Sequence, residues 1–113
     1  MHTVVELKNY QDEAESLLSS EERRHIIDYL VANPEAGEIM KGTGGIRKLR
    51  WRRGASGKSG GVQIIHFYKN PSMPLFLLTV YGKNQQENLS KADRNTMKQL
   101  VTLLERGWKK WKA

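Results

Sequence analysis

The chain contains no cysteine, so disulfides and thiolate metal sites are excluded. It also lacks an apolar run long enough to span a membrane, and its N-terminus lacks the basic and then apolar order of a signal peptide. With 113 residues the chain can bury one modest core. These absences predict a single cytoplasmic domain that has no membrane partner.

Acidic residues are missing from a long central stretch, since none occurs between Glu38 and Glu87. The net charge of the whole chain is +7, but residues 1–45 carry −5 and residues 46–113 carry +12. Solvated protein surfaces usually mix both signs. A cationic stretch without acids favours a polyanionic partner, above all a nucleic acid, over an acidic protein or a membrane surface.

Residues 52–61, RRGASGKSGG, resemble the end of a nucleotide-binding P-loop because they contain Gly57-Lys58-Ser59. The P-loop pattern requires glycine six residues before the lysine, and Arg52 occupies that position. It also requires a helix next, whereas residues 62–68 are β-branched and aromatic. We therefore interpret this segment as a loop between two strands.

The first half of the chain predicts one strand and two helices. Residues 3–7 have the composition of a short strand, and apolar side chains then recur at helical spacing from Tyr10 to Leu18. Ser19 and Glu22 have the spacing of a capping box, which predicts the start of a second helix. That helix ends at Asn33-Pro34, because the residue before a proline disfavours helical backbone.

The second half predicts three strands and a final helix. After a loop over residues 34–45, the strands cover residues 46–53, 62–69 and 75–81, and Ser90 to Asp93 begins the helix. We expect one α+β domain over residues 1–113 with the order β-α-α-β-β-β-α. Its antiparallel sheet would carry helices on one face and leave room for a groove on the other.

The strand predicted over residues 46–53 is strongly basic. Side chains alternate between the faces of a strand, so Leu49 and Trp51 point toward the expected core. Lys48, Arg50 and Arg52 then share the other face, roughly 7 Å apart, close to the phosphate spacing of extended single-stranded RNA. Charge protection of an edge strand explains one or two cations but not such a row.

Three other side chains of the basic half have alternative interpretations. Tyr81 either fills the rim of the core or stacks on a base. Gly82 permits a turn that returns Lys83 to the sheet. His66 shares a face with Ile64, which favours a packed or hydrogen-bonded histidine over a catalytic one. The histidines have no metal-ligand spacing, so we expect neither a metal ion nor another cofactor.

Two sequence blocks carry a resemblance to a known family. They are GTGGIRKLRWRRGASGKSGGVQIIHFYKN, residues 42–70, and LLTVYGKNQQENLS, residues 77–90. The chain resembles the RelE/HigB superfamily of type II toxins, close to its HigB-like branch, over roughly residues 3–105. The resemblance implies a RelE-like fold related to microbial ribonucleases and a ribosome-dependent mRNA endoribonuclease. It also implies a cognate antitoxin with a helix-turn-helix DNA-binding domain, so that DNA is contacted only through the antitoxin.

The resemblance assigns the basic family positions to Lys48, Arg50 and Lys58. Arginines found in some relatives are replaced by Gln63 and Asn84, and a tyrosine is replaced near Ser90. Together with the charge pattern, this leads to two groups. The expected catalytic residues are Lys48, Arg50, Lys58, Tyr81 and Lys83, and the expected RNA contacts are Arg47, Arg52, Arg53, Gln63 and Asn84.

The expected reaction is attack of an RNA 2′-hydroxyl on the adjacent phosphorus, with cations stabilising the added negative charge. Lys83 or Lys58 would serve as acid or base if neighbouring cations lowered its pKa by several units from about 10.4. The alternative is a basic nucleic-acid-binding module without catalysis. Composition alone does not separate the two.

Overall fold

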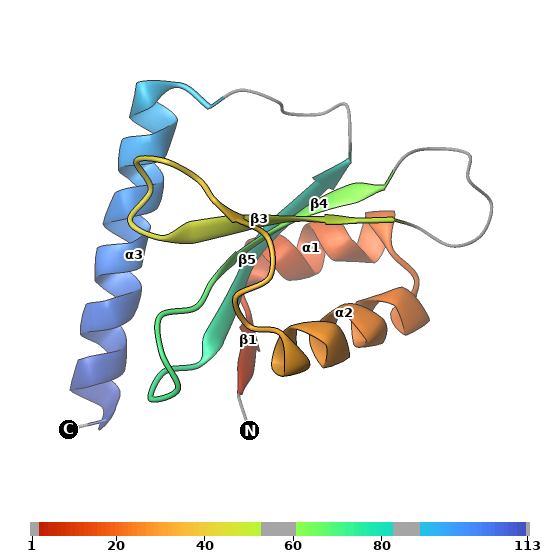
Figure 1. The fold of residues 1–113 in the computed structure, drawn as a ribbon, viewed down its shortest axis with the longest axis horizontal. Helices are drawn as coiled ribbons and strands as arrows, with labels where there is room; N and C mark the ends of the chain where they lie inside the picture. The colour runs from red at the N-terminus through yellow and green to blue at the C-terminus, as the bar shows by residue number, and fades with distance from the viewer. Residues whose placement is uncertain (1–2, 53–60, 83–88, 113) are drawn as a thin grey trace.

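The computed structural model describes residues 3–52, 61–82 and 89–112, with side chains described as far as Lys110. Figure 1 shows a twisted sheet with α1 and α2 on one side and α3 on the other. The elements are β1 (Val4–Glu6), α1 (Lys8–Leu17), α2 (Ser20–Ala32), β2 (Glu38–Ile39), β3 (Ile46–Trp51), β4 (Val62–Phe67), β5 (Leu75–Gly82) and α3 (Lys91–Lys112). The predicted α+β class is confirmed, and β2 is an added strand within the region predicted as a loop.

The strands form one sheet in the order β1-β5-β4-β3-β2. The predicted meander of β3, β4 and β5 is confirmed, because both pairings are antiparallel. β1 is parallel to β5 and pairs with it only from Leu75 to Leu77. β2 adds a short antiparallel edge beside β3. A strand, and not a helix, follows the segment that resembles a P-loop, as the composition of residues 62–68 predicts.

The first core cluster lies between the sheet and the α1–α2 pair. Tyr10 and Ala14 of α1 are fully buried one turn apart, and so are Ile26 and Leu30 of α2. They pack with inward side chains of β4 and β5, namely Val62, Ile64, Leu75, Leu77 and Val80. The predicted capping box starts α2, since the Ser19 backbone N–H donates to Glu22 Oε1 (2.9 Å) and the Glu22 N–H donates to Ser19 Oγ (3.1 Å).

The second core cluster lies on the opposite face and is closed by α3. Met97, Leu100, Val101, Leu104 and Trp108 pack on the other set of alternating strand residues, Ile46, Ile65, Phe67, Phe76 and Leu78. This placement differs from the expectation that all helices share one face. Its physical reason is that β4 and β5 are apolar on both faces, so both faces need a cover. Figure 1 shows α3 on the side of the sheet away from α1 and α2.

Both ends of α3 are fixed by side chains. The predicted cap at Ser90 is confirmed, because Ser90 N–H donates to Asp93 Oδ2 (3.1 Å) and Asp93 N–H donates to Ser90 Oγ (3.0 Å). Near the other end, Trp108 Nε1 donates to the carbonyl of Ser72 (2.9 Å). Of the helices in the described ranges, none is long and apolar enough to cross a lipid bilayer.

The turn before β3 is built around a buried threonine. Thr43 Oγ1 donates to the Met40 carbonyl (2.6 Å) and accepts from Ile46 N–H (3.1 Å). Gly44, which follows it, has φ +83°, a left-handed conformation that glycine adopts without strain. The Gly-Thr-Gly-Gly block thus directs the chain into β3 and sets the start of the basic strand.

Candidate nucleic-acid interface

Two rows of side chains cross the sheet on the face that α3 covers only in part. In the first row Arg50 pairs with Gln63, and Gln63 pairs with Tyr81. In the second row Glu38 pairs with Lys48, Lys48 with Ile65, and Ile65 with Thr79. Residues paired in register have side chains on the same face, only about 5 Å apart. The sheet therefore gathers side chains from four strands into one patch.

The predicted alternation of the basic strand is confirmed. Leu49 and Trp51 pack with the helical cluster of α1 and α2. The Trp51 ring meets Tyr29 of α2 edge-on, with ring centroids 5.6 Å apart. Lys48 and Arg50 occupy the opposite face, where Lys48 is half-buried and Arg50 is exposed. Arg52 is exposed just beyond the end of β3.

A small pocket of about 150 Å³ lies at the β2 edge of this patch. Three cationic side chains line it, those of Lys41, Lys48 and Arg94, together with the carboxylate of Glu38. Arg94 also donates from Nη1 to the Lys41 carbonyl, which ties the start of α3 to the loop after β2. Three cations around one small cavity favour an anion such as a phosphate group, although the nearby Glu38 carboxylate opposes it.

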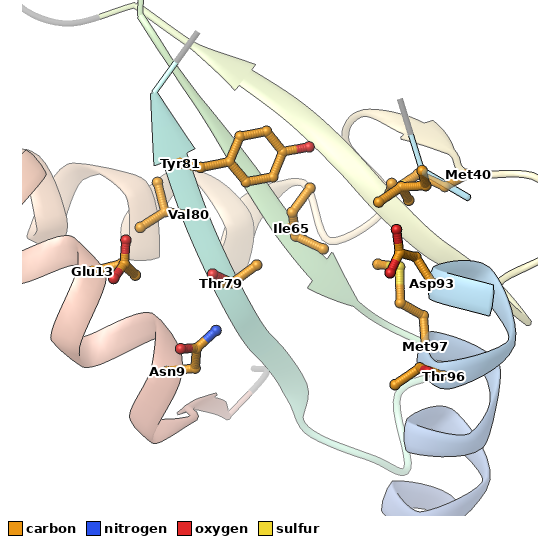
Figure 2. A pocket seen from close by; sticks show the side chains of 11 residues that line it. Asn9, Glu13, Met40, Ile65, Thr79, Val80, Tyr81, Asp93, Thr96 and Met97 are labelled. Atoms are coloured by element: carbon orange, nitrogen blue, oxygen red, sulfur yellow. The ribbon is translucent and has the colours of Figure 1, made fainter. Parts of the chain in front are cut away.

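A larger pocket of about 530 Å³ adjoins the small one and shares Met40, Tyr81 and Leu89 with it. Figure 2 shows that β5 contributes Thr79, Val80 and Tyr81 and that α3 contributes Asp93, Thr96 and Met97. Asn9 and Glu13 reach it from α1, across β5. The wall between the two pockets is thus formed partly by the Tyr81 ring.

Tyr81 is half-buried. This position is compatible with both roles that the sequence suggests for it, filling the rim of the core and stacking on a base. Its ring packs at the margin of the α3 cluster and also lines both pockets. Burial raises the pKa of the Tyr81 hydroxyl above its usual value. The hydroxyl therefore stays protonated at neutral pH and can donate a hydrogen bond or a proton.

Glu38 is the member of the patch that the sequence analysis missed. It was assigned to a loop, and no local pattern predicts a strand of only two residues. Its position depends on pairing with β3, which places Glu38 opposite Lys48 in register, and both residues line the small pocket. The close packing of this edge depends on Gly37, where a Cβ atom would lie 2.5 Å from the Lys48 carbonyl oxygen.

Arg47, which was expected to contact RNA, lies on the other face from Lys48 and Arg50. Its Nη1 donates to the carbonyls of Glu35 (3.0 Å) and Gly37 (3.3 Å). The ring Nε2 of its cross-strand neighbour His66 hydrogen-bonds the carbonyl between them, that of Ala36 (2.9 Å). Two paired side chains thus hold three consecutive carbonyls just before β2.

His66 is fully buried, and the prediction of a packed, hydrogen-bonded histidine is confirmed. Burial lowers the pKa of His66, the Ala36 hydrogen bond partly opposes this, and nearby Arg47 lowers it further. His66 is therefore neutral at physiological pH. His66 lies on the face of the sheet opposite the patch, where it contacts the chain just before β2.

Four predicted residues, Arg53, Lys58, Lys83 and Asn84, lie outside the described residues. Of the six described members of the predicted set, Lys48, Arg50, Gln63 and Tyr81 lie in the patch with Glu38, Arg52 lies just beyond β3, and Arg47 lies on the other face. In residues 3–52, 61–82 and 89–112 no three His, Asp or Glu side chains gather as a metal site would require.

A second cationic feature runs along the outer face of α3. Lys91, Arg94, Lys98, Arg106 and Lys109 are three, four or eight residues apart, so they follow one face of the helix. All except Arg94 are exposed. Because Arg94 also lines the small pocket, this stripe begins at the patch and extends away from it.

No protein-family model matches this chain. Of the patch residues, Lys48, Arg50 and Gln63 lie in the first of the two sequence blocks that resemble the RelE/HigB superfamily and Tyr81 lies in the second, whereas Glu38 precedes both.

Proposed function

We propose that the protein is a metal-independent endoribonuclease that cleaves mRNA on the ribosome and acts as the toxin of a type II toxin–antitoxin module. The observation that carries the proposal is the gathering of Glu38, Lys48, Arg50 and Tyr81 on one face of the sheet. These side chains provide a proton acceptor, two cations and a proton donor. The RelE/HigB resemblance supports the same activity.

The reaction needs a base for the 2′-hydroxyl, and Glu38 suits that role. A carboxylate can accept this proton directly, whereas a lysine base would need its pKa lowered by several units. When the carboxylate takes the proton, the 2′-oxygen attacks the adjacent phosphorus. Lys48 and Arg50 stabilise the additional negative charge on the phosphorane.

The 5′-oxygen then leaves as its bond to phosphorus breaks, and it takes a proton from the Tyr81 hydroxyl. An alkoxide is a far stronger base than a phenolate, so the raised pKa of Tyr81 does not prevent this transfer. The products are a 2′,3′-cyclic phosphate and a 5′-hydroxyl. Water finally returns a proton to Tyr81 and removes one from Glu38, which regenerates the enzyme.

The proposed partners follow from the resemblance and from the charge. The ribosome would hold mRNA in the attack geometry, a contribution that compensates for modest intrinsic acid–base chemistry. The α3 stripe offers cations for ribosomal RNA. A cognate antitoxin would inhibit the protein and would contact DNA through its own helix-turn-helix domain. Such a module acts in the cytoplasm.

A non-catalytic RNA-binding module is the second candidate, and the α3 stripe favours it, because all of its cations except Arg94 lie outside the proposed catalytic patch. One experiment separates the two. Ribosomes programmed with a synthetic mRNA are incubated with the protein, and the cleaved nucleotide is then replaced by its 2′-deoxy form. Our proposal requires that the unmodified mRNA is cleaved to give cyclic phosphate ends and that the 2′-deoxy mRNA is not cleaved. Bound but intact mRNA in both cases would favour the module.

A further inference from the structure

The two adjoining pockets differ in the charge of their walls. The small pocket is lined by three described cations, Lys41, Lys48 and Arg94. The larger pocket has no lysine or arginine among the described residues that line it, and its charged groups are the carboxylates of Glu13 and Asp93. A phosphate is thus favoured in the first and disfavoured in the second.

The shape and composition of the larger pocket suit a flat, partly polar ring. Its volume of about 530 Å³ is ample for a nucleobase. The Tyr81 ring and the thioethers of Met40 and Met97 provide polarisable surfaces for stacking. Because Tyr81 and Met40 line both pockets, a base in the larger one would place its own phosphate near the smaller one.

Asp93 gives this pocket a hydrogen-bond preference. Its Oδ2 accepts from the Ser90 N–H at the start of α3 (3.1 Å). Asp93 is exposed, and Figure 2 shows its carboxylate on the α3 side of the cavity, opposite the β5 residues. A carboxylate oxygen only accepts hydrogen bonds, so it favours a base that carries an amino group.

We propose that the larger pocket binds one unstacked nucleobase of the RNA and selects bases with an exocyclic amino group, so that cytosine is preferred to uracil. Cytosine and uracil have nearly the same shape but carry an amino donor and a carbonyl acceptor, respectively, at position 4. That this base belongs to a cleaved RNA rests on the proposed function. The preference itself is a property of binding and does not require cleavage.

The test compares cytidine 3′-monophosphate with uridine 3′-monophosphate by calorimetry and by NMR titration of wild-type protein. The cytidine nucleotide should bind about tenfold more tightly, the factor expected for one additional hydrogen bond to a charged acceptor. The N4,N4-dimethylated cytidine nucleotide, which has no amino hydrogen, should lose that advantage. Equal affinities for all three nucleotides would overturn the proposal.

Asp93→Asn provides the matched protein change. The amide oxygen can still cap α3 while the amide nitrogen offers a donor to the cavity, so the preference should disappear or reverse toward uridine. Asp12→Asn is the control, because Asp12 is exposed and pairs with Lys8 on α1. An unchanged preference in Asp93→Asn would contradict the assignment. If Asp93→Asn is poorly folded, the comparison of cytidine and dimethylated cytidine nucleotides still tests the inference, because it uses wild-type protein.

Other outcomes distinguish this inference from the proposed function. If a short oligolysine peptide binds wild type but not Asp93→Asn, while no nucleotide binds, the pocket takes a basic protein segment and our inference is wrong. If the protein cleaves mRNA but binds both nucleotides equally, only the base pocket is rejected. If the cytidine preference is found without any cleavage, the pocket stands and the proposed enzyme fails.

Discussion

Glu38 and Lys48 lie opposite each other in the antiparallel pairing of β2 with β3, and both line the small cationic pocket. The chain between them makes a turn around buried Thr43. This relationship brings an acidic residue to the edge of the basic strand, although residues 39–86 contain no acidic side chain. It also divides the proposed roles in the patch between one proton acceptor, Glu38, and the cations beside it.

Glu38→Gln should lower the cleavage rate by about 10²-fold while leaving ribosome binding nearly unchanged. The substitution keeps the size of the side chain but removes its capacity to take a proton at neutral pH. Single-turnover cleavage on programmed ribosomes measures the rate, and co-sedimentation measures binding. Glu35→Gln is the matched control, since Glu35 is exposed and its carbonyl, not its carboxylate, contacts Arg47. Equal rates for the two variants would remove Glu38 from the mechanism.

Arg50 and Arg52 should separate catalysis from binding. Arg50 pairs with Gln63 in the row that ends at Tyr81, whereas Arg52 lies just beyond β3. Arg50→Ala should reduce the rate by about 10²-fold with little loss of affinity. Arg52→Ala should weaken RNA binding and reduce the slope of its salt dependence by about 0.7 for one lost phosphate contact. A proportional loss of rate and binding in both variants would count against this division.

Gly37→Ala should be destabilising, because Gly37 has φ +94° and a Cβ atom would approach the Lys48 carbonyl oxygen to 2.5 Å. We expect a loss of about 1–3 kcal/mol in the free energy of unfolding. The β2 edge would also shift and carry Glu38 away from Lys48, so activity should fall further than stability explains. Urea unfolding and single-turnover cleavage measure the two effects.

Gly107→Ala is the control for that substitution. Gly107 lies exposed in α3 with nothing within 4 Å of the position of a Cβ atom. Alanine should raise the free energy of unfolding there by about 0.5–1 kcal/mol and leave activity unchanged. A Gly37→Ala protein that is as stable and active as Gly107→Ala would show that the β2 edge tolerates the extra atom.

His66 should make the protein less stable in acid. Burial lowers the pKa of His66 in the folded state, so the unfolded chain, with a histidine pKa of about 6.5, binds the proton more readily. The stabilising contribution of neutral His66 is complete above about pH 6.5 and is lost as the pH falls toward the lowered folded pKa. Urea unfolding of wild type, His66→Gln and the exposed-histidine control His25→Gln across this range measures the effect. Only His66→Gln should lose the fall in stability below about pH 6.5. If the free energy of unfolding depends on pH in the same way in all three proteins, His66 is not its cause.

The parts of the fold that depend on local signals were predictable from the sequence. The Ser19–Glu22 capping box is one such signal, because both of its hydrogen bonds join residues three apart. The alternation of Leu49 and Trp51 against Lys48 and Arg50 is another, since a strand places successive side chains on opposite faces. These signals predicted most of the elements and the main cationic row.

The features that depend on distant pairing were not predictable in this way. The two residues of β2 are a strand only because Lys48 and Arg47 pair with them. The side chains of β4 and β5 are apolar on both faces of the sheet. The second face must therefore also be covered, and α3 packs there, opposite α1 and α2. The charge pattern groups Arg47 with the expected RNA contacts. Strand alternation, however, places Arg47 on the same face as Leu49, where it binds the Glu35 carbonyl.

Primer extension on mRNA from translating ribosomes shows directly whether the protein cleaves mRNA during translation. Purified wild-type protein is added to an active translation reaction, and Glu38→Gln protein that binds ribosomes equally well is the matched control. We predict new 5′ ends within codons that appear with wild type, require translation, and are strongly reduced with Glu38→Gln. Intact mRNA in the presence of folded, ribosome-bound wild-type protein would contradict the account.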